Sequence, residues 1–253
     1  MSAYSLPVLM YHYVSRFPGA IAVSPEHFED QCRGMAEHGW RGIGLDEAEA
    51  FLLKGAPLPP RSLLITFDDG YRSNYTLAYP ILQKYSMKAT IFAIGVSFGT
   101  DHYKDTDYAM TPHFGAAEAA EMAGSGLISI QSHTYDMHQW PPYETDSAVR
   151  ENILQLPGES EEAYVEALTA DFTRSRAQLE AAAGRPVDVL AYPAGQYSTL
   201  AQVTLQNLGV HVTLSTNPGI NTVVKGLPQT LTAMLRFGVT EDLSPEALLE
   251  MIQ

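Results

Sequence analysis

The sequence is poor in the residues that would suit a disulfide-rich fold, a membrane span or a nucleic-acid partner. Its 253 residues include one cysteine, Cys32, so no disulfide can form within the chain. Lysine and arginine number 15 against 29 acidic residues, which leaves a formal net charge of −14 and no basic stripe for phosphates. No apolar run approaches the ~20 residues that a membrane helix needs. These absences argue against nucleic-acid binding and against a transmembrane segment.

The start of the chain also lacks the marks of a secretory leader. The first residues, MSAYSLPVLMYHYV, show neither a basic beginning nor a small-residue cleavage site. We therefore expect either a cytoplasmic protein or a chain that begins after a removed leader, and both alternatives stay open. Residues 1–253 contain no obvious linker, internal repeat or low-complexity tract, and 45% of them are hydrophobic. We predict a single domain with a sizeable core.

Apolar, β-branched runs alternate with helix-like segments along the chain. One helix is expected to begin at Pro25 after an N-cap at Ser24, and another after Ser244. Strands separated by helices imply a parallel sheet with right-handed crossovers, and about seven repeats indicate a closed or nearly closed β/α barrel. The expected strands lie at 8–14, 62–67, 88–95, 127–134, 187–195, 210–216 and 233–239.

Polar side chains stand at the ends of these expected strands, where a β/α barrel gathers its active site. Asp68 and Asp69 follow the strand LLITF, His133 and His138 follow LISIQS, and His12 lies inside VLMYHYV. One carboxylate and two imidazoles form a common ligand set for a catalytic divalent metal ion. Asp69, His133 and His138 would supply that set, which leaves Asp68 free to take a proton from water.

Each of these features also has a purely structural explanation. An Asp-Asp-Gly triplet after a strand is often only a turn, and a lone histidine is commonly a hydrogen-bonded core residue. Adjacent aspartates on a strand point to opposite faces, so Asp68 and Asp69 can serve one site only if the chain turns between them. His102 and His113 fall in a polar loop and are expected to be solvated. The conjunction at neighbouring strand ends is more specific than any of its parts.

Two segments, TFDDG and SHTYDMH, resemble the first two motifs of the polysaccharide deacetylases, carbohydrate esterase family 4. The resemblance implies that Asp68 is the general base and that Asp69, His133 and His138 bind the metal. Most members space the two histidines four residues apart, whereas here they are five apart. That spacing is similar to the branch that deacetylates poly-β-1,6-N-acetylglucosamine. The implied fold is α/β, a distorted (β/α)7-type barrel of the polysaccharide deacetylase kind.

A third segment, YPAG, resembles the motif that lines the substrate groove of this family. The resemblance places Tyr192 and Pro193 in the groove and implies that the backbone N–H of Ala194 binds the oxyanion. Ala191 stands where the family has an arginine, and the fourth motif and a late LxxH are missing. The same branch resembles a circular permutation of the family, with its acid histidine in an N-terminal MYHxx strand. MYHYV matches that pattern and implies that His12 is the general acid.

One arginine and several aromatic residues complete the candidate site. Arg236 in LRFGV is our candidate for the missing arginine, holding Asp68 ionised, and a solvated strand-end arginine is the alternative. Aromatic side chains near the motifs could stack on sugar faces or could simply be core residues; they are Tyr11, Tyr71, Tyr135, Trp140, Tyr192 and Tyr197.

Together these residues predict a metal-dependent hydrolase that removes N-acetyl groups from N-acetylglucosamine-type saccharides. One divalent metal ion is expected, zinc first, with nickel, cobalt, iron or manganese as alternatives. Two rival functions are a metal hydrolase of another small amide or ester and a non-catalytic carbohydrate-binding relative. The intact Asp68, Asp69, His133 and His138 argue against the second. The metal, the linkage and length of the substrate, and the oligomeric state are left open.

Overall fold

Parallel strands in the order β1-β5-β6-β7-β8-β9 form the centre of the computed structural model, which describes residues 2–145 and 148–253. The strands span Ala3–Tyr11, Ser62–Phe67, Ala89–Ala93, Ile128–Ser132, Val189–Ala191 and Val212–Leu214. A parallel bridge joins Leu214 to Met234, and β11 (Phe237–Gly238) pairs with β1. The circuit thus returns to its first strand, which confirms the distorted (β/α)7-type barrel.

Four short strands complete the sheets. β10 (Ile220–Val224) runs antiparallel to the start of β1 and makes the main sheet mixed. β4 (Arg41–Gly42) pairs with the start of β5, while β2 (Tyr13–Val14) and β3 (Ala22–Val23) form a small sheet of their own. The expected strand VLMYHYV therefore ends at Tyr11, and His12 lies in the break before β2.

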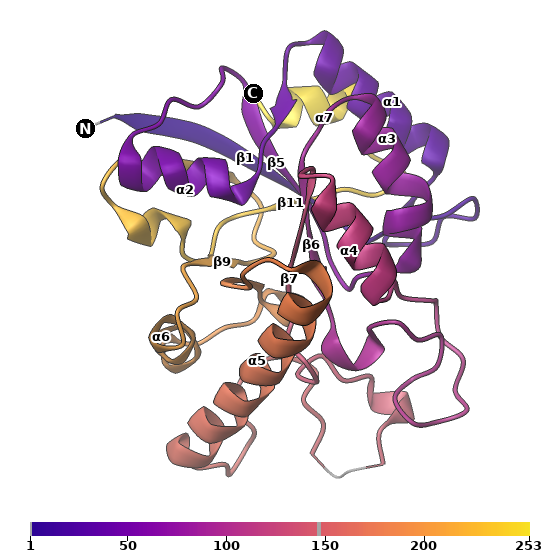
Figure 1. Ribbon diagram of the computed structural model, residues 1–253, viewed down its shortest axis with the longest axis vertical. Helices are drawn as coiled ribbons and strands as arrows, with labels where there is room; N and C mark the ends of the chain where they lie inside the picture. Colours follow the sequence, from indigo (N-terminus) through magenta and orange to yellow (C-terminus); the bar gives the residue numbers. More distant parts are fainter. Residues whose placement is uncertain (1, 146–147) are drawn as a thin grey trace.

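Helices cover the outside of the barrel (Figure 1). The Ser24 side chain accepts the His27 N–H at the start of α1, and Ser244 caps α7 in the same way, as expected from the sequence. None of the helices in the described ranges is long and apolar enough to cross a membrane. The α-helices are α1 (Pro25–Glu37), α2 (Leu45–Lys54), α3 (Tyr79–Lys84), α4 (Ala116–Gly124), α5 (Glu161–Ala183), α6 (Thr199–Asn207) and α7 (Pro245–Met251).

The alternating faces of strand β5 show how the core positions the functional residues. Ile65 and Phe67 pack outward into the cluster that α1, α3, α4 and α7 cover. Leu64 points the other way, into a cluster drawn from strands on several sides of the barrel. Because side chains alternate along a strand, Thr66 and then Asp68 continue the inward face of Leu64. The barrel interior therefore opens onto Asp68 at the carboxyl end of the strand.

Candidate active site

A sharp turn after β5 brings both aspartates into one site. The strand ends at Phe67, and Asp69 adopts the left-handed conformation with φ of 71°. Gly70 is also left-handed, and a Cβ there would lie 3.0 Å from the Cβ of Ala93. A side chain at residue 70 would therefore collide with β6. The turn removes the objection that adjacent strand residues face apart, because Asp69 no longer has strand geometry.

Three side chains converge on one point beside this turn. Asp69 Oδ1 lies 3.5 Å from His133 Nε2 and 3.9 Å from His138 Nε2. The other ring nitrogens are occupied, because His133 Nδ1 donates to the Ala191 carbonyl at 2.8 Å and His138 Nδ1 to the Glu151 carbonyl at 3.0 Å. A carbonyl oxygen only accepts, so we assign the proton of each ring to Nδ1. Both Nε2 lone pairs then face the carboxylate.

This arrangement fits a divalent metal ion. Asp69 Oδ1 is buried and has no hydrogen-bond partner among the described residues, and the three ligand atoms lie within 4.8 Å of one another. Burial lowers the pKa of His133, although Asp68 and Asp69 oppose the shift. The ring is therefore neutral at neutral pH, which is the ligand form. Three lone-pair donors that converge without a proton between them are stabilised by a cation.

The second histidine lies on an irregular loop, as its spacing predicts. His133 directly follows β7, and residues 133–140 contain no helix or strand. A five-residue spacing does not put two rings on one face of a regular helix. The loop instead folds back so that the His133 and His138 rings meet edge to face, with centroids 5.2 Å apart.

Asp68 forms a buried ion pair with Arg236. The guanidinium donates to both carboxylate oxygens, Nη1 to Oδ1 at 2.7 Å and Nη2 to Oδ2 at 2.8 Å. Arg236 is fully buried, and its Nε donates to the Ser215 carbonyl. The alternative of a solvated arginine is therefore wrong. Burial by itself raises the pKa of Asp68, but Arg236, His133 and His12 together hold it well below its usual range.

His12 stands beside this pair, at the break between β1 and β2. It is half-buried, and its proximity to Asp68 contributes to the low pKa of that carboxyl. The Asn74 side chain donates to the His12 carbonyl at 2.8 Å, so the first turn after β5 fixes the backbone here. Asp136, in the loop after β7, pairs with Lys104 at 2.9 Å.

The third motif forms a tight turn after β8. Ala194 has φ of 53° and Gly195 φ of 68°, and a Cβ on Gly195 would lie 2.1 Å from Thr216 Oγ1. Pro193 and Tyr192 are buried, and the Tyr192 ring stacks on Tyr197 with centroids 4.8 Å apart. Tyr192 thus offers no open face to a sugar, which corrects the stacking role considered for it.

The other aromatic candidates divide into core and surface. Tyr11 is fully buried against Phe28, so its stacking role is also wrong. Tyr135 lies under the Arg174 guanidinium, 3.9 Å from it. Trp140, two residues after His138, is 58% exposed. Tyr197 is also exposed, at 40%, so Trp140 and Tyr197 are the candidate rings that are open to solvent.

Tyr71 contacts His113, a histidine whose burial was not predicted from the sequence. Its ring lies between Tyr13 and His113, with centroid distances of 4.9 and 4.8 Å. His113 was expected to be solvated but is 8% exposed, and burial lowers its pKa. A backbone bridge between Tyr71 and His113 brings the loop back over the site. No local sequence pattern predicts this contact, because it joins segments that are far apart in the sequence.

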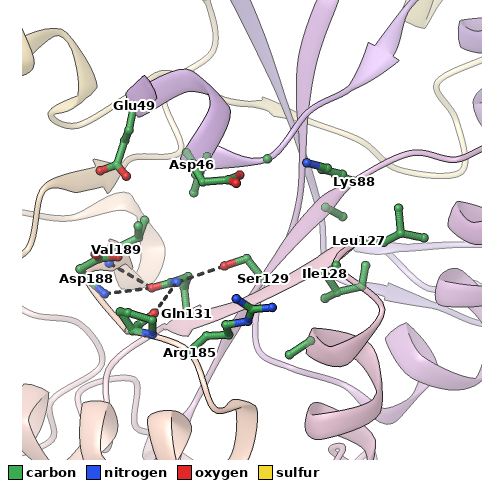
Figure 2. A pocket seen from close by; sticks show the side chains of 16 residues that line it. Asp46, Glu49, Lys88, Leu127, Ile128, Ser129, Gln131, Arg185, Asp188 and Val189 are labelled. Atoms are coloured by element: carbon green, nitrogen blue, oxygen red, sulfur yellow. Dashed lines mark hydrogen bonds between the residues drawn. The ribbon is translucent and has the colours of Figure 1, made fainter. Parts of the chain in front are cut away.

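A separate hollow of about 380 Å³ opens at the amino ends of β6, β7 and β8 (Figure 2). Gln131 crosses its floor, and its amide nitrogen donates to Ser129 Oγ and to the Pro186 carbonyl. Its amide oxygen accepts the backbone N–H groups of Asp188 and Val189. Further charged residues around the hollow are Asp46, Glu49, Lys88 and Arg185. None of the predicted site residues lines it.

Comparison with known proteins identifies relatives across most of the chain. A family model described as polysaccharide deacetylase matches residues 55–213. YxkH of Bacillus subtilis (strain 168) is 30% identical over 214 residues, which cover 85% of this chain and 65% of that protein. The poly-beta-1,6-N-acetyl-D-glucosamine N-deacetylase of Staphylococcus aureus (strain MRSA252) is 35% identical over 117 residues, 46% of this chain and 38% of that protein. The chain thus spans less than two-thirds of either curated relative.

A solved structure extends the likeness to the whole fold. IcaB from Ammonifex degensii superposes with a TM-score of 0.78 at 27% identity, covering 98% of this chain and 97% of that one.

Proposed function

The chain belongs to the polysaccharide deacetylase family, and from this premise we propose that it hydrolyses N-acetyl groups of N-acetylglucosamine-type saccharides. Members of this family are metal-dependent carbohydrate de-N-acetylases. One observation carries the proposal for this chain. The metal-ligand cluster of Asp69, His133 and His138 lies beside the buried Asp68–Arg236 pair, at the carboxyl end of the barrel. A cation site next to an ionised carboxylate is the arrangement that amide hydrolysis needs.

We propose Asp69, His133 and His138 as the ligands of one divalent ion, with zinc as the first choice. Two imidazoles and a carboxylate suit zinc and also suit nickel, cobalt, iron and manganese. A bound ion of this kind acidifies water and polarises a carbonyl group, which lets a weak carboxylate base suffice.

Asp68 is the proposed general base. Its depressed pKa keeps it ionised at neutral pH, and Arg236 fixes its orientation through two hydrogen bonds. In the first step, the water oxygen forms a bond to the acetyl carbon and Asp68 takes the water proton. The backbone N–H of Ala194, in the left-handed turn after β8, donates to the oxyanion that develops on the acetyl oxygen.

His12 is the proposed general acid. The C–N bond breaks in the second step, the leaving nitrogen takes a proton from the His12 ring, and the products are acetate and a free amine. His12 lies near Asp68 but follows a different strand, β1, so we propose that it approaches the substrate from a different side. Beyond the reacting unit, we propose that the exposed Trp140 stacks on a neighbouring sugar and that Tyr71 and Tyr135 support the groove wall.

Acetate release from a panel of β-1,4- and β-1,6-linked N-acetylglucosamine oligomers tests the proposal. We expect release that a chelator abolishes and that one added equivalent of zinc restores. The Asp68→Asn variant is the matched control. It retains the three proposed ligands, so we expect it to bind the metal but not to release acetate. Release of acetate only from a simple aryl ester would favour a small-ester hydrolase. Metal-independent binding of oligomers without release would favour a carbohydrate-binding protein.

A further inference from the structure

The loop that carries His133 and His138 contains an energetically unfavourable backbone conformation. Thr134, which follows His133, adopts φ of 72° and is fully buried. The left-handed region is a genuine outlier for a β-branched residue and costs of order 1–3 kcal/mol. Such a conformation persists only where the surrounding structure holds it. The groups that hold this loop therefore determine where His138 lies relative to His133.

Helix α5 supplies the main contacts to the loop. Asp171, in the middle of this helix, accepts two consecutive backbone N–H groups with its two carboxylate oxygens. Oδ1 accepts from Tyr135 at 2.8 Å and Oδ2 accepts from Asp136 at 2.7 Å. Both amides lie between the proposed ligands His133 and His138. A single carboxylate thus fixes the direction of the chain at the centre of the loop.

A second residue on the same face of α5 holds the start of the loop. Ser175 lies one turn after Asp171, and its hydroxyl is 2.8 Å from that of Ser132. The Ser132 hydroxyl in turn accepts the N–H of Thr134, the residue with the unfavourable φ. The Arg174 guanidinium covers the Tyr135 ring. These contacts tie the loop to the helix at successive positions.

The opposite side of the loop is held by the turn after β6. Gly95 N–H donates to the Thr134 carbonyl at 3.0 Å, and Val96 N–H donates to the Tyr135 carbonyl at 2.9 Å. A Cβ on Gly95 would lie 2.2 Å from the Tyr135 ring. The turn after β6 thus accounts for the carbonyls of Thr134 and Tyr135, and Asp171 for the amides of Tyr135 and Asp136.

We propose that Asp171 is a positioning residue that sets the separation of His133 and His138 and thereby the metal affinity of the site. This inference rests on the proposed metal site. Asp171 hydrogen-bonds to backbone amides of the loop and not to the ring of His133 or His138. Its effect on the metal site would therefore pass through the loop backbone. Burial raises the pKa of Asp171 to about 6, while the two amide hydrogen bonds oppose the shift. Burial disfavours the charged form of this carboxylate, and the two amide hydrogen bonds favour it. A charged carboxylate can accept one hydrogen bond with each of its two oxygens.

Metal affinity of Asp171→Asn tests the proposal directly. An amide side chain has nearly the same shape but only one acceptor oxygen, so its NH₂ group would oppose one of the two backbone amides. Partners that orient metal ligands typically change metal affinity by ~10–100-fold. We expect zinc binding, measured by competition with a chromophoric chelator, to weaken by that factor. We also expect the cobalt(II) absorption spectrum to change, because it reports ligand geometry.

Glu166→Gln is the matched control. It removes the same charge from an exposed position on the same helix, and we expect its zinc affinity to stay within about twofold of the parent. An Asp171→Asn variant with the zinc affinity and cobalt spectrum of the parent would overturn the inference. A similar loss in Glu166→Gln would overturn it too, because the effect would then be one of net charge.

Hydrogen exchange of the parent protein covers the case in which Asp171→Asn does not fold. The Tyr135 and Asp136 amides should be strongly protected in the metal-free parent, since their partner is Asp171. Exchange of these two amides at the rate of an open loop would refute the inference by itself. A parent that binds no zinc would overturn the proposed function and this inference together.

Discussion

The two ends of the barrel differ in how their buried polar atoms are satisfied. At the carboxyl end, Asp69 Oδ1 has no hydrogen-bond partner among the described residues and faces the Nε2 atoms of His133 and His138. At the amino end, the buried amide of Gln131 has a partner for every donor and both of its acceptor positions (Figure 2). The Asp69 oxygen therefore needs a partner from outside the described residues, whereas the Gln131 amide needs none.

The comparison teaches that the unsatisfied Asp69 oxygen, with two imidazole nitrogens facing it, marks a better candidate site than the open hollow does. The amino end has a hollow of about 380 Å³ with many charged side chains at its rim. One of them, Lys88, pairs with Glu47 beside the hollow at 2.9 Å. Native proteins satisfy nearly all buried polar groups, so each exception calls for an explanation. A cation bound by Asp69, His133 and His138 would explain the exception at Asp69.

Loss of a proposed metal ligand is the strongest way to test the carboxyl end. His133→Ala removes a buried ring that supplies one of the three ligand atoms. We expect metal content to fall well below one per chain and acetate release to fall by more than the ~10²–10⁴ typical of a lost general base. Metal analysis after gel filtration measures the first effect. A variant that retains one tightly bound ion and most of its activity would show that His133 is not a ligand.

Asp68→Asn should separate chemistry from binding at the same end. The amide cannot take a proton from water, so we expect kcat to fall by ~10²–10⁴. The metal ligands are untouched, so metal content should equal that of the parent. KM for an N-acetylglucosamine oligomer should change little, because the base acts in the transition state. A large rise in KM with an unchanged kcat would instead assign Asp68 to substrate binding.

Arg236→Met should affect stability as well as the site. The substitution leaves the buried Asp68 carboxylate unpaired, and breaking a buried pair in this way costs ~3–5 kcal/mol. The low folded-state pKa of Asp68 contributes stability above its unfolded value of ~3.9, and that contribution disappears as the pH falls. The stability difference between parent and variant should therefore be largest near pH 7 and shrink below pH ~4.

Urea unfolding at a series of pH values measures this difference. The double variant Arg236→Met with Asp68→Asn is the control, since it also removes the Asp68 charge that the single variant leaves unpaired. A difference that is the same at pH 3 and pH 7 would mean that Arg236 stabilises the barrel without its charge.

Local sequence patterns were sufficient to predict the centre of the site. The continuous apolar run LLITF and the parallel sheet place Asp68 at a strand end, and a similar argument applies to His133 after LISIQS. The α/β barrel and the caps of α1 and α7 also follow from short-range rules. The meeting of Asp69, His133 and His138 was predictable because each of them follows a strong strand signal directly or within a few residues.

The parts that were missed depend on contacts between distant segments. Asp171 sits within an ordinary amphipathic helix, and only its packing against the loop after β7 reveals the two amide hydrogen bonds. His113 looked solvated because its loop returns over Tyr71 through a backbone bridge that no local pattern encodes. Tyr192 was considered for sugar stacking, but Tyr197 covers its ring.

Gln131→Ala tests the amino end, where we expect a loss of stability without a loss of function. The substitution leaves the N–H groups of Asp188 and Val189 without their acceptor. Unsatisfied buried groups cost ~1–3 kcal/mol each. The free energy of unfolding should fall by an amount of this order, while kcat/KM at 25 °C stays within twofold of the parent. A tenfold loss of kcat/KM in the folded variant would remove the distinction between the two ends.

Lys88→Ala should have the smallest effect of all. Lys88 stands at the rim of the hollow and pairs with Glu47, and about a third of each side chain is exposed. Exposed pairs of this kind contribute ~0–1 kcal/mol, and salt screens them. We expect a change in Tm of no more than ~2–4 °C, which 1 M salt should reduce further, and no change in metal content or acetate release. The reason is that Lys88 touches neither the barrel interior nor any of the proposed ligands.

If Lys88→Ala lowered acetate release tenfold while thermal stability stayed the same, the charged rim would have a function of its own. The contrast between a satisfied amino end and an unsatisfied carboxyl end would then no longer distinguish scaffold from site.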